Sequence, residues 1–342
     1  MLRVVAYTGG DSAPSGRYRV EQYVPYLKNE NIDVTVRPSR AGSFPPEGSA
    51  WKRCVWAVKN LAEHAPCASE SRHYDLTLFQ REMFSTAVTF EPLTKRPRVF
   101  DVDDAAWARP HGGFARRLAA LCDHVICGNS FLAEEFSHSN RNISVLPTPI
   151  DTHRWVPATE RANDNRPVIG WLGLSYGFRY LYAIEAALAE VLRRCAAVRL
   201  RIISNRAPEF RTLPAGQVEF VSFASQPEQV HFQQMTIGIM PLEDSVICRG
   251  KCSFKMLQCM ACGIPVVVTP CGMNAEVLQK GCVGFGARTD AEWIDALDAL
   301  ITNPDLATRM GQAGRAVVER DYSLNVLAPR FSGILRGVVQ NS

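Results

Sequence analysis

The chain has 342 residues, of which 46% are hydrophobic and 21% charged, a composition typical of a soluble protein with two globular domains. No run approaches the roughly 20 apolar residues of a membrane-spanning helix, and the first residues lack the apolar core of a signal peptide, so we expect a cytoplasmic protein. The net charge of +4 is too small to indicate nucleic-acid binding, but it leaves peripheral association of a basic patch with the inner membrane open.

Short apolar, β-branched runs alternate with helical segments in two series. The first series consists of residues 2–7, 33–37, 75–79, 98–102, 124–127 and 144–146. The second consists of residues 168–173, 198–203, 218–221, 236–240, 265–269 and 283–285. This alternation predicts an α/β protein with two doubly wound, Rossmann-like domains, and a ligand at the carboxyl ends of the strands in the cleft between them.

The polar, proline-bounded stretch 156–167 interrupts the two series. We therefore assign residues 1–157 to a first domain, 158–167 to a linker and 168–322 to a second domain. The remaining residues, 323–342, have the pattern of a helix, which we expect to pack back on the first domain.

The segment 249–270, RGKCSFKMLQCMACGIPVVVTP, carries the clearest functional signal. It predicts a short helix over 254–262, capped by Ser253 and ended by Gly263 in the left-handed conformation. The amino end of such a helix presents free N–H groups and the positive end of its dipole, which suits an anion.

Three cations surround that helix start: Arg249, Lys251 and Lys255. Gln258 lies one turn after Lys255 and is placed to bind a group attached to the anion. A lysine opposes the dipole at this end, so a bound anion explains the pattern better than the alternative, a solvated cationic loop.

The segment resembles the donor-binding region of glycosyltransferase family 4, which has the GT-B fold. In that family a glutamate, seven residues and a second glutamate precede a run like AMACGTPVV; here the run is CMACGIPVV, and the two glutamates are replaced by Gly250 and Gln258. The resemblance implies that Gln258 contacts the nucleotide ribose and that Lys255 stabilises the leaving diphosphate as a catalytic group. Gly250 has no side chain for the sugar hydroxyls.

The resemblance extends along nearly the whole chain. The stretch 168–181, VIGWLGLSYGFRYL, is similar to the opening strand and loop of the family's second domain, which implies donor contacts from Gly173, Ser175 and Arg179. Glu276 matches a glutamate common in a later loop, although the helix dipole alone also favours an acidic residue there.

In the first domain, the loop after the first strand brings Gly16, Arg17 and Arg19 toward the cleft, unless it is an ordinary strand–helix turn. Asp103 and Asp104 follow the fourth strand with Asp101, and we assign them to catalysis, as groups that orient the acceptor hydroxyl or accept its proton. Helix capping and metal binding are the alternatives. His111 and the glycines after it are a weaker candidate for a mobile loop.

The eleven cysteines are an odd number, and most lie in apolar patterns. Buried thiols behave as small hydrophobic side chains, so we expect no disulfide framework. Cys259 and Cys262 have Cys-x-x-Cys spacing, which leaves zinc as an alternative, but both fall inside the predicted helix without a matching second pair. We expect no metal and no resident cofactor.

These patterns predict an enzyme that transfers a hexose-type sugar from a nucleoside diphosphate sugar to an acceptor hydroxyl. The resemblance implies retention of configuration without a metal, and leaves the acceptor open among a glycan, a lipid-linked molecule and a small molecule. Two alternatives remain: a non-catalytic nucleotide-sugar-binding subunit and a GT-B nucleotide-sugar epimerase.

Overall fold

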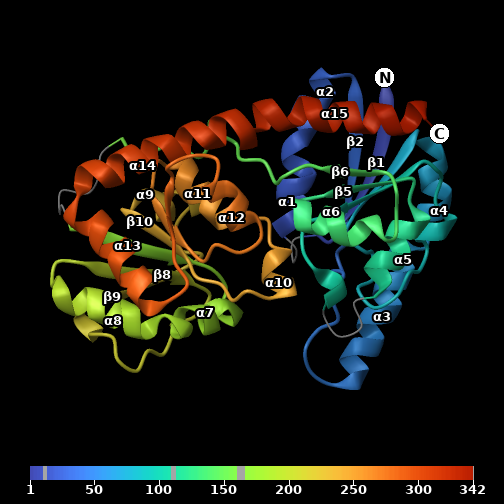
Figure 1. The fold of residues 1–342 in the computed structure, drawn as a ribbon. Helices are drawn as coiled ribbons and strands as arrows, with labels where there is room; N and C mark the ends of the chain where they lie inside the picture. Colours follow the sequence, from blue (N-terminus) through green and yellow to red (C-terminus); the bar gives the residue numbers. More distant parts are fainter. Residues whose placement is uncertain (11–13, 109–112, 160–165, 342) are drawn as a thin grey trace. The chain divides into compact units, whose positions relative to one another are not determined.

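The computed structural model describes residues 1–10, 14–108, 113–159 and 166–341. The chain forms two compact units: unit 1 is Met1–Pro149, Arg249–Cys252 and Leu324–Ser342, and unit 2 is Ile150–Cys248 and Ser253–Ser323. Each unit contains a six-stranded parallel sheet with helices on both faces (Figure 1). The predicted α/β class with two doubly wound sheets is confirmed.

All six strands of unit 1 were predicted from apolar runs. They are β1 (Leu2–Thr8), β2 (Ile32–Pro38), β3 (Leu76–Gln80), β4 (Arg98–Val102), β5 (His124–Cys127) and β6 (Ile143–Val145), in the order β2-β1-β3-β4-β5-β6. The helices are α1 (Pro14–Arg19), α2 (Val24–Asn29), α3 (Ala50–His64), α4 (Cys67–Glu70), α5 (Phe114–Leu121), α6 (Ser130–Ser137) and α15 (Leu324–Gln340). The central strands β3 and β4 are buried along their whole length, including their polar residues Thr77, Gln80, Arg98 and Asp101.

The last helix, α15, completes the core of unit 1. Its Leu327, Phe331 and Leu335 join a buried cluster with Val4 of β1, and the ring of Phe331 lies 4.8 Å from that of Tyr23. Figure 1 shows α15 running over the sheet of unit 1 next to α2. The amphipathic pattern of the chain end is therefore satisfied by burial on this sheet.

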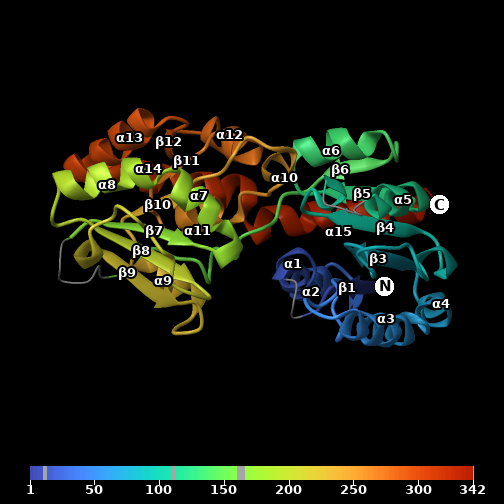
Figure 2. The ribbon, with the colours of Figure 1, turned by 90° about the horizontal axis from the view of Figure 1, so that it is seen from below.

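The strands of unit 2 are β7 (Val168–Leu172), β8 (Arg199–Ser204), β9 (Val218–Ser222), β10 (Ile237–Met240), β11 (Val266–Val268) and β12 (Gly284–Gly286), in the order β12-β11-β10-β7-β8-β9. The helices are α7 (Phe178–Ala183), α8 (Glu185–Arg194), α9 (Glu228–Gln233), α11 (Phe254–Ala261), α12 (Met273–Leu278), α13 (Asp290–Thr302) and α14 (Pro304–Val317), and α10 (Val246–Arg249) ends at the boundary of the two units. Figure 2 shows α8 and α13 over one face of this sheet and α9 over the other.

The segment between the two sheets belongs to unit 2 from Ile150 onward, whereas the sequence pattern places the boundary after residue 157. The side chain of Trp155 packs edge-on against Phe232 at 5.3 Å. The Arg315 guanidinium donates to the carbonyl oxygens of Thr152, Trp155 and Ala261, which ties this segment to α11 and α14. The assignment differs because these contacts are distant in sequence. Residues 160–165 of the expected linker lie outside the described residues.

Among the helices that the structure describes, none combines the length and hydropathy needed to cross a membrane.

A buried ion pair fixes α1 on the sheet of unit 1. Arg19 and Asp101 are each 1% exposed, and two guanidinium nitrogens of Arg19 donate to the Asp101 carboxylate at 3.0 and 2.5 Å. Arg19 also donates to the carbonyl oxygen of Leu146 at 2.7 Å. Burial opposes the charge, but the attraction of Asp101 outweighs it and raises the pKa of Arg19. The expectation that Arg19 brings positive charge to a ligand is wrong, because this charge is already neutralised.

We predict that replacing Arg19 with methionine lowers the free energy of unfolding by about 3–5 kcal/mol, because it leaves the Asp101 carboxylate buried without a partner. Urea denaturation measures the loss. The double variant Arg19→Met/Asp101→Leu removes both charges and should recover most of the stability; a double variant as unstable as Arg19→Met would show that packing, and not the lone charge, is responsible.

Candidate functional site

The predicted anion-binding helix is present as α11, one residue shorter than expected. Gly238 of β10 allows its close approach, because a Cβ there would lie 2.4 Å from the Cys259 sulfur. Gly263 ends the helix with φ +68°, as predicted. Ser253 does not cap it: its φ is +50° and its hydroxyl donates to Oδ1 of Asn274 at 2.7 Å, so the predicted cap is wrong.

Lys255 points from the first turn of α11 toward α9. Its ammonium lies 2.7 Å from Oε1 of Glu228, and its nitrogen is within 5.9 Å of the ring centroids of Phe223, Phe232 and Phe254. Its side chain remains 32% exposed, whereas that of Glu228 is 9% exposed. The three ring faces and the carboxylate stabilise the cation in this place.

Gln258 lies one turn further and is fully buried. Its amide nitrogen donates to the same oxygen of Glu228 at 3.3 Å, and its Oε1 is buried without a hydrogen-bond partner. Lys255 and Gln258 thus share the carboxylate of Glu228, and Oε1 of Gln258 remains able to accept a hydrogen bond. This polar group can bind a polar ligand or a water molecule at the face of α11.

Arg249 and Lys251 belong to unit 1, in the short segment Arg249–Cys252. Asn129 holds this segment: its side-chain nitrogen donates to the carbonyl oxygens of Arg249 and Lys251 at 3.2 and 3.0 Å. Its Oδ1 accepts from the backbone N–H of Leu132 at 2.8 Å and so caps α6. The segment is thereby attached to the loop that follows β5.

Two glycines make room for this attachment. A Cβ at Gly128 would lie 2.3 Å from the Cys252 sulfur, and a Cβ at Gly250 would lie 2.6 Å from Cβ and 2.8 Å from the backbone nitrogen of Ala105. The Cys252 thiol donates to the carbonyl oxygen of Asp103 at 3.2 Å. Position 250 therefore has no space for a glutamate side chain in this backbone.

The carboxylates after β4 are brought together with cations that neutralise them. Arg81, which follows β3 with φ +64°, pairs with Asp103 at 2.7 Å and with Asp104 at 3.1 Å. Burial opposes the charge of Arg81, but the two carboxylates outweigh it and raise its pKa. Asp103 and Asp104 lie at the carboxyl edge of the sheet, beside the Arg249–Cys252 segment, whereas Asp101 is taken up by Arg19.

Glu82, next to Arg81, is an acid that the sequence patterns did not single out. Its side chain is only 6% exposed, and burial, with a further contribution from Asp104, raises its pKa to about 7. The signal was present in the sequence, since Arg81 and Glu82 directly follow an apolar strand. Glu228 also escaped attention, because an acidic residue after a proline is common at any helix start.

The remaining predicted residues of unit 1 lie around α1. Gly16 packs on Thr8 of β1, where an added Cβ would lie 3.1 Å from Cβ of Thr8. Arg17 is exposed and stacks on the Tyr18 ring at 4.6 Å. His111 lies outside the described residues.

In unit 2, two predicted residues lie in the loop after β7 and a third lies in α7. The Gly173 N–H donates to the carbonyl oxygen of Ile203, and that of Ser175 to Oδ1 of Asn205 at 2.8 Å. Arg179 is exposed and pairs with Glu243 at 3.1 Å while its guanidinium lies over the Tyr180 ring. Glu276 is half-buried in the first turn of α12, and its charge contributes to the raised pKa of Tyr322.

The cysteines of the 248–262 region are free and buried. Cys259 packs on Gly238, and burial raises the pKa of Cys259 and Cys262, to about 12 for Cys262. Within the described residues, no cluster of three or more Cys, His, Asp or Glu side chains is arranged to hold a metal ion.

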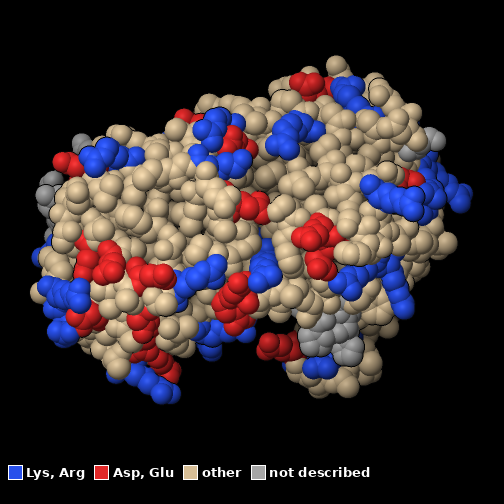
Figure 3. Space-filling view, in the orientation of Figure 1, with Lys and Arg blue, Asp and Glu red and all other residues tan. Residues whose placement is uncertain are grey.

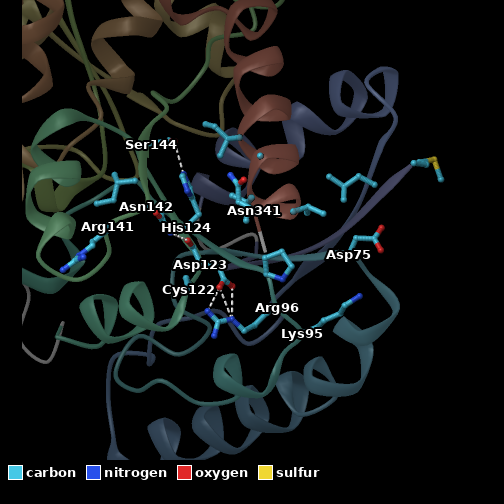
Figure 4. Close-up of a pocket in the computed structure, with 18 residues that line it drawn as sticks. Asp75, Lys95, Arg96, Cys122, Asp123, His124, Arg141, Asn142, Ser144 and Asn341 are labelled. Atoms are coloured by element: carbon cyan, nitrogen blue, oxygen red, sulfur yellow. Dashed lines mark hydrogen bonds and ion pairs between the residues drawn. The ribbon is translucent and has the colours of Figure 1, made fainter.

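Two cavities lie away from all these residues. One, of about 1410 Å³ in unit 1, opens at the amino ends of β4, β5 and β6 beside the end of α15. Figure 4 shows Arg96 paired with Asp123 and His124 hydrogen-bonded to Ser144 in its wall. The other, of about 940 Å³ in unit 2, also lies at amino ends, including that of β7. Neither contains a predicted site residue.

Comparison with known proteins identifies the second unit. Residues 166–303 match the family model of glycosyl transferases group 1. It is 24% identical over 252 residues to the GDP-mannose-dependent alpha-(1-6)-phosphatidylinositol monomannoside mannosyltransferase of Mycobacterium tuberculosis, covering 65% of this chain and 64% of the relative. The chain spans 49% to 64% of the length of the curated relatives it matches.

Solved structures share the whole fold at low identity. Sucrose-phosphate synthase from Thermosynechococcus elongatus has a TM-score of 0.72 at 12% identity, covering 100% of both chains. Anabaena HepE in complex with UDP-glucose has a TM-score of 0.68 at 13% identity, covering 98% of this chain and 99% of that one. The sheet of each unit is thus arranged as in the GT-B fold.

We predict that restoring the family glutamate at position 250 is destabilising. Even Gly250→Ala should lower the free energy of unfolding by about 1–3 kcal/mol, because its Cβ overlaps Ala105. Gly216, which has open space around its Cα, is the matched control, and Gly216→Ala should leave stability nearly unchanged. Urea denaturation compares the two. Equal stability of the two alanine variants would show that the backbone at position 250 moves aside.

We also predict a pH dependence of stability from Glu82. Its pKa rises from 4.5 in the unfolded chain to about 7 in the folded one, so the folded state loses stability as the pH rises through this range. The loss amounts to about 3 kcal/mol for a buried group. Glu82→Gln removes it, so the advantage of this variant should grow between pH 4.5 and pH 7 in urea titrations; a constant difference would contradict the raised pKa.

Proposed function

We propose that this chain is a member of the glycosyl transferases group 1 and transfers a hexose-type sugar from a nucleoside diphosphate sugar to an acceptor hydroxyl. One observation supports this most: α11 carries a half-exposed lysine at its first turn and a fully buried glutamine one turn later, in the sequence context of the family's donor segment. The M. tuberculosis relative uses GDP-mannose by its name, and the Anabaena structure contains UDP-glucose, so UDP- and GDP-hexoses are the donors to test.

In this proposal Lys255 and the N–H groups at the start of α11 stabilise the negative charge that develops on the leaving diphosphate. Glu228 holds the lysine in place before the donor arrives, and the diphosphate then competes with this carboxylate. The buried Oε1 of Gln258 accepts a hydroxyl of the donor. In these steps the diphosphate replaces Glu228 as the ion-pair partner of Lys255, and α11 does not need to rearrange.

Asp103 and Asp104 orient the acceptor hydroxyl. Their pairing with Arg81 fixes them at the carboxyl edge of the sheet of unit 1, where ligands of doubly wound sheets bind. We further propose that the sugar is transferred with retention of configuration and without a metal. In a retaining transfer of this kind, an oxygen of the departing phosphate accepts the proton of the acceptor hydroxyl.

The test is hydrolysis of a panel of UDP- and GDP-hexoses in the absence of acceptor, together with calorimetric binding of UDP and GDP. We expect one donor to be hydrolysed slowly and its nucleotide to bind. Binding of a nucleotide without hydrolysis of any donor would favour the alternative of a non-catalytic binding subunit.

We predict opposite effects for the two partners in the Lys255–Glu228 pair. Lys255→Ala should weaken nucleoside diphosphate binding about 100-fold, since it removes a charge aimed at the phosphates. Glu228→Gln should strengthen it severalfold, because it removes the competing carboxylate. Lys280→Ala, at an exposed lysine of unit 2, is the control. If both substitutions reduce stability and leave binding unchanged, the pair is structural and the proposed diphosphate site is wrong.

A further inference from the structure

The helix α3 of unit 1 has an inverted amphipathic pattern. Its buried face is polar or hydrogen-bonded: Trp56, Asn60 and His64 are spaced one turn apart and are each less than 9% exposed. The indole nitrogen of Trp56 donates to the carbonyl oxygen of Ala41 at 3.0 Å, and the amide nitrogen of Asn60 to that of Gly42 at 2.9 Å. These bonds fix the rotation of the helix about its axis.

The opposite face is apolar and exposed. Trp51 is 75% exposed, Val58 is 67% exposed and Leu61 is 38% exposed, and Cys54 lies exposed between them. At 100° per residue these four side chains fall within an arc of about 80°, and they extend over about 15 Å of the helix. We call these four residues the α3 stripe. An exposed indole and two exposed aliphatic side chains in one line are unusual on a protein surface that stays in water.

Cations border the stripe on one side. Lys52 and Lys59 lie along this edge, and both are exposed and, within the described part of the chain, without an ion-pair partner. Glu63, the carboxylate of this helix, is turned away, since it accepts from the backbone N–H groups of Arg40 and Ala41 at 2.6 and 3.0 Å.

In the view of Figure 3, the surface where Figure 1 places α3 is mostly uncharged, with basic and acidic side chains beside it. The acidic residue of the loop before the helix is Glu47, which is exposed. Lys52 and Lys59 outnumber it around the stripe. The local charge is therefore positive, in contrast to the weak net charge of the whole chain.

We propose that the α3 stripe docks unit 1 on a membrane surface that contains anionic lipids. An interfacial helix inserts a narrow apolar face between lipid headgroups while its flanking lysines and arginines bind the phosphates, and an indole prefers this boundary. A single helix face about 15 Å long, bordered on one side by Lys52 and Lys59, fits this geometry. A protein interface would require a wider apolar area with a polar rim of both signs.

This surface is independent of the donor site in unit 2 and therefore of the proposed reaction. The stripe begins on the side of the carboxyl edge of the sheet of unit 1, because α3 starts after the loop that follows β2. Docking there would bring the edge that carries Asp103 and Asp104 close to the lipid surface. An acceptor presented at that surface is then within reach.

The test uses the full chain in co-sedimentation with vesicles of phosphatidylcholine alone and of phosphatidylcholine mixed with phosphatidylglycerol. We expect binding to the anionic vesicles that falls as salt is added. Val58→Glu should reduce this binding about tenfold or more, because it places a carboxylate in the stripe. Lys52→Glu/Lys59→Glu should reduce it by at least about tenfold on anionic vesicles.

Matched controls separate docking from loss of folding. Leu93 is 62% exposed in the same unit, and Leu93→Glu changes an apolar side chain to the same carboxylate elsewhere. Lys28→Glu reverses an exposed charge on α2. Both controls should bind vesicles as the unchanged protein does. The proposal is overturned if the unchanged protein does not bind anionic vesicles, or if Leu93→Glu loses as much binding as Val58→Glu. It is also overturned if sedimentation velocity shows that the unchanged protein is a dimer and that Val58→Glu only dissociates this dimer, because the stripe would then be an interface between two copies of the chain.

Discussion

The side chain of Asn129 makes the attachment on which the candidate site of unit 1 depends. One amide caps α6 through its oxygen and holds the carbonyls of Arg249 and Lys251 through its nitrogen. Since both the oxygen and the nitrogen of the amide are used, hydrogen bonds join the loop after β5 to a segment about 120 residues later in the chain. The cost appears as two positions that must be glycine: 128, which faces the Cys252 sulfur, and 250, which faces Ala105.

Charge neutralisation is the second constraint. Three buried or half-buried cations near the candidate residues have a partner of opposite sign: Arg19 has Asp101, Arg81 has Asp103, and Lys255 has Glu228. A buried charge without a partner is costly, so these pairs hold the site in one arrangement before any ligand binds. Of these three cations Lys255 is the most exposed, with 32% of its side chain open to solvent, which makes its pair the one at which an incoming anion can exchange with a carboxylate.

The fold could be predicted from the sequence because most of its strands carry short apolar, β-branched runs that the sheets bury, such as Val4, Val5 and Ala6 in β1 and Val266, Val267 and Val268 in β11. The end of α11 could also be predicted from the local sequence, since Gly263 adopts the left-handed conformation that ends helices. The partners could not be predicted in the same way. Glu228 lies 27 residues from Lys255, and Asn129 lies 122 residues from Lys251. Ser253 is of a residue type that often caps helices, but its hydroxyl donates to Asn274 instead, a contact that the local sequence does not reveal.

The two missing family glutamates have different physical explanations. At position 250 the space for a side chain is occupied by Ala105, so the replacement follows from the attachment of the Arg249–Cys252 segment. At position 258 the amide of Gln258 lies 3.3 Å from the carboxylate of Glu228, so a negative charge is still present beside α11 but is held on α9. A glutamate at 258 would face Glu228 in a buried place, and the two like charges would repel each other. The residue type at position 258 therefore depends on Glu228: with a carboxylate on α9, an amide fits at position 258 and a second carboxylate does not. The Glu228 carboxylate then accepts from both Lys255 and the buried amide of Gln258.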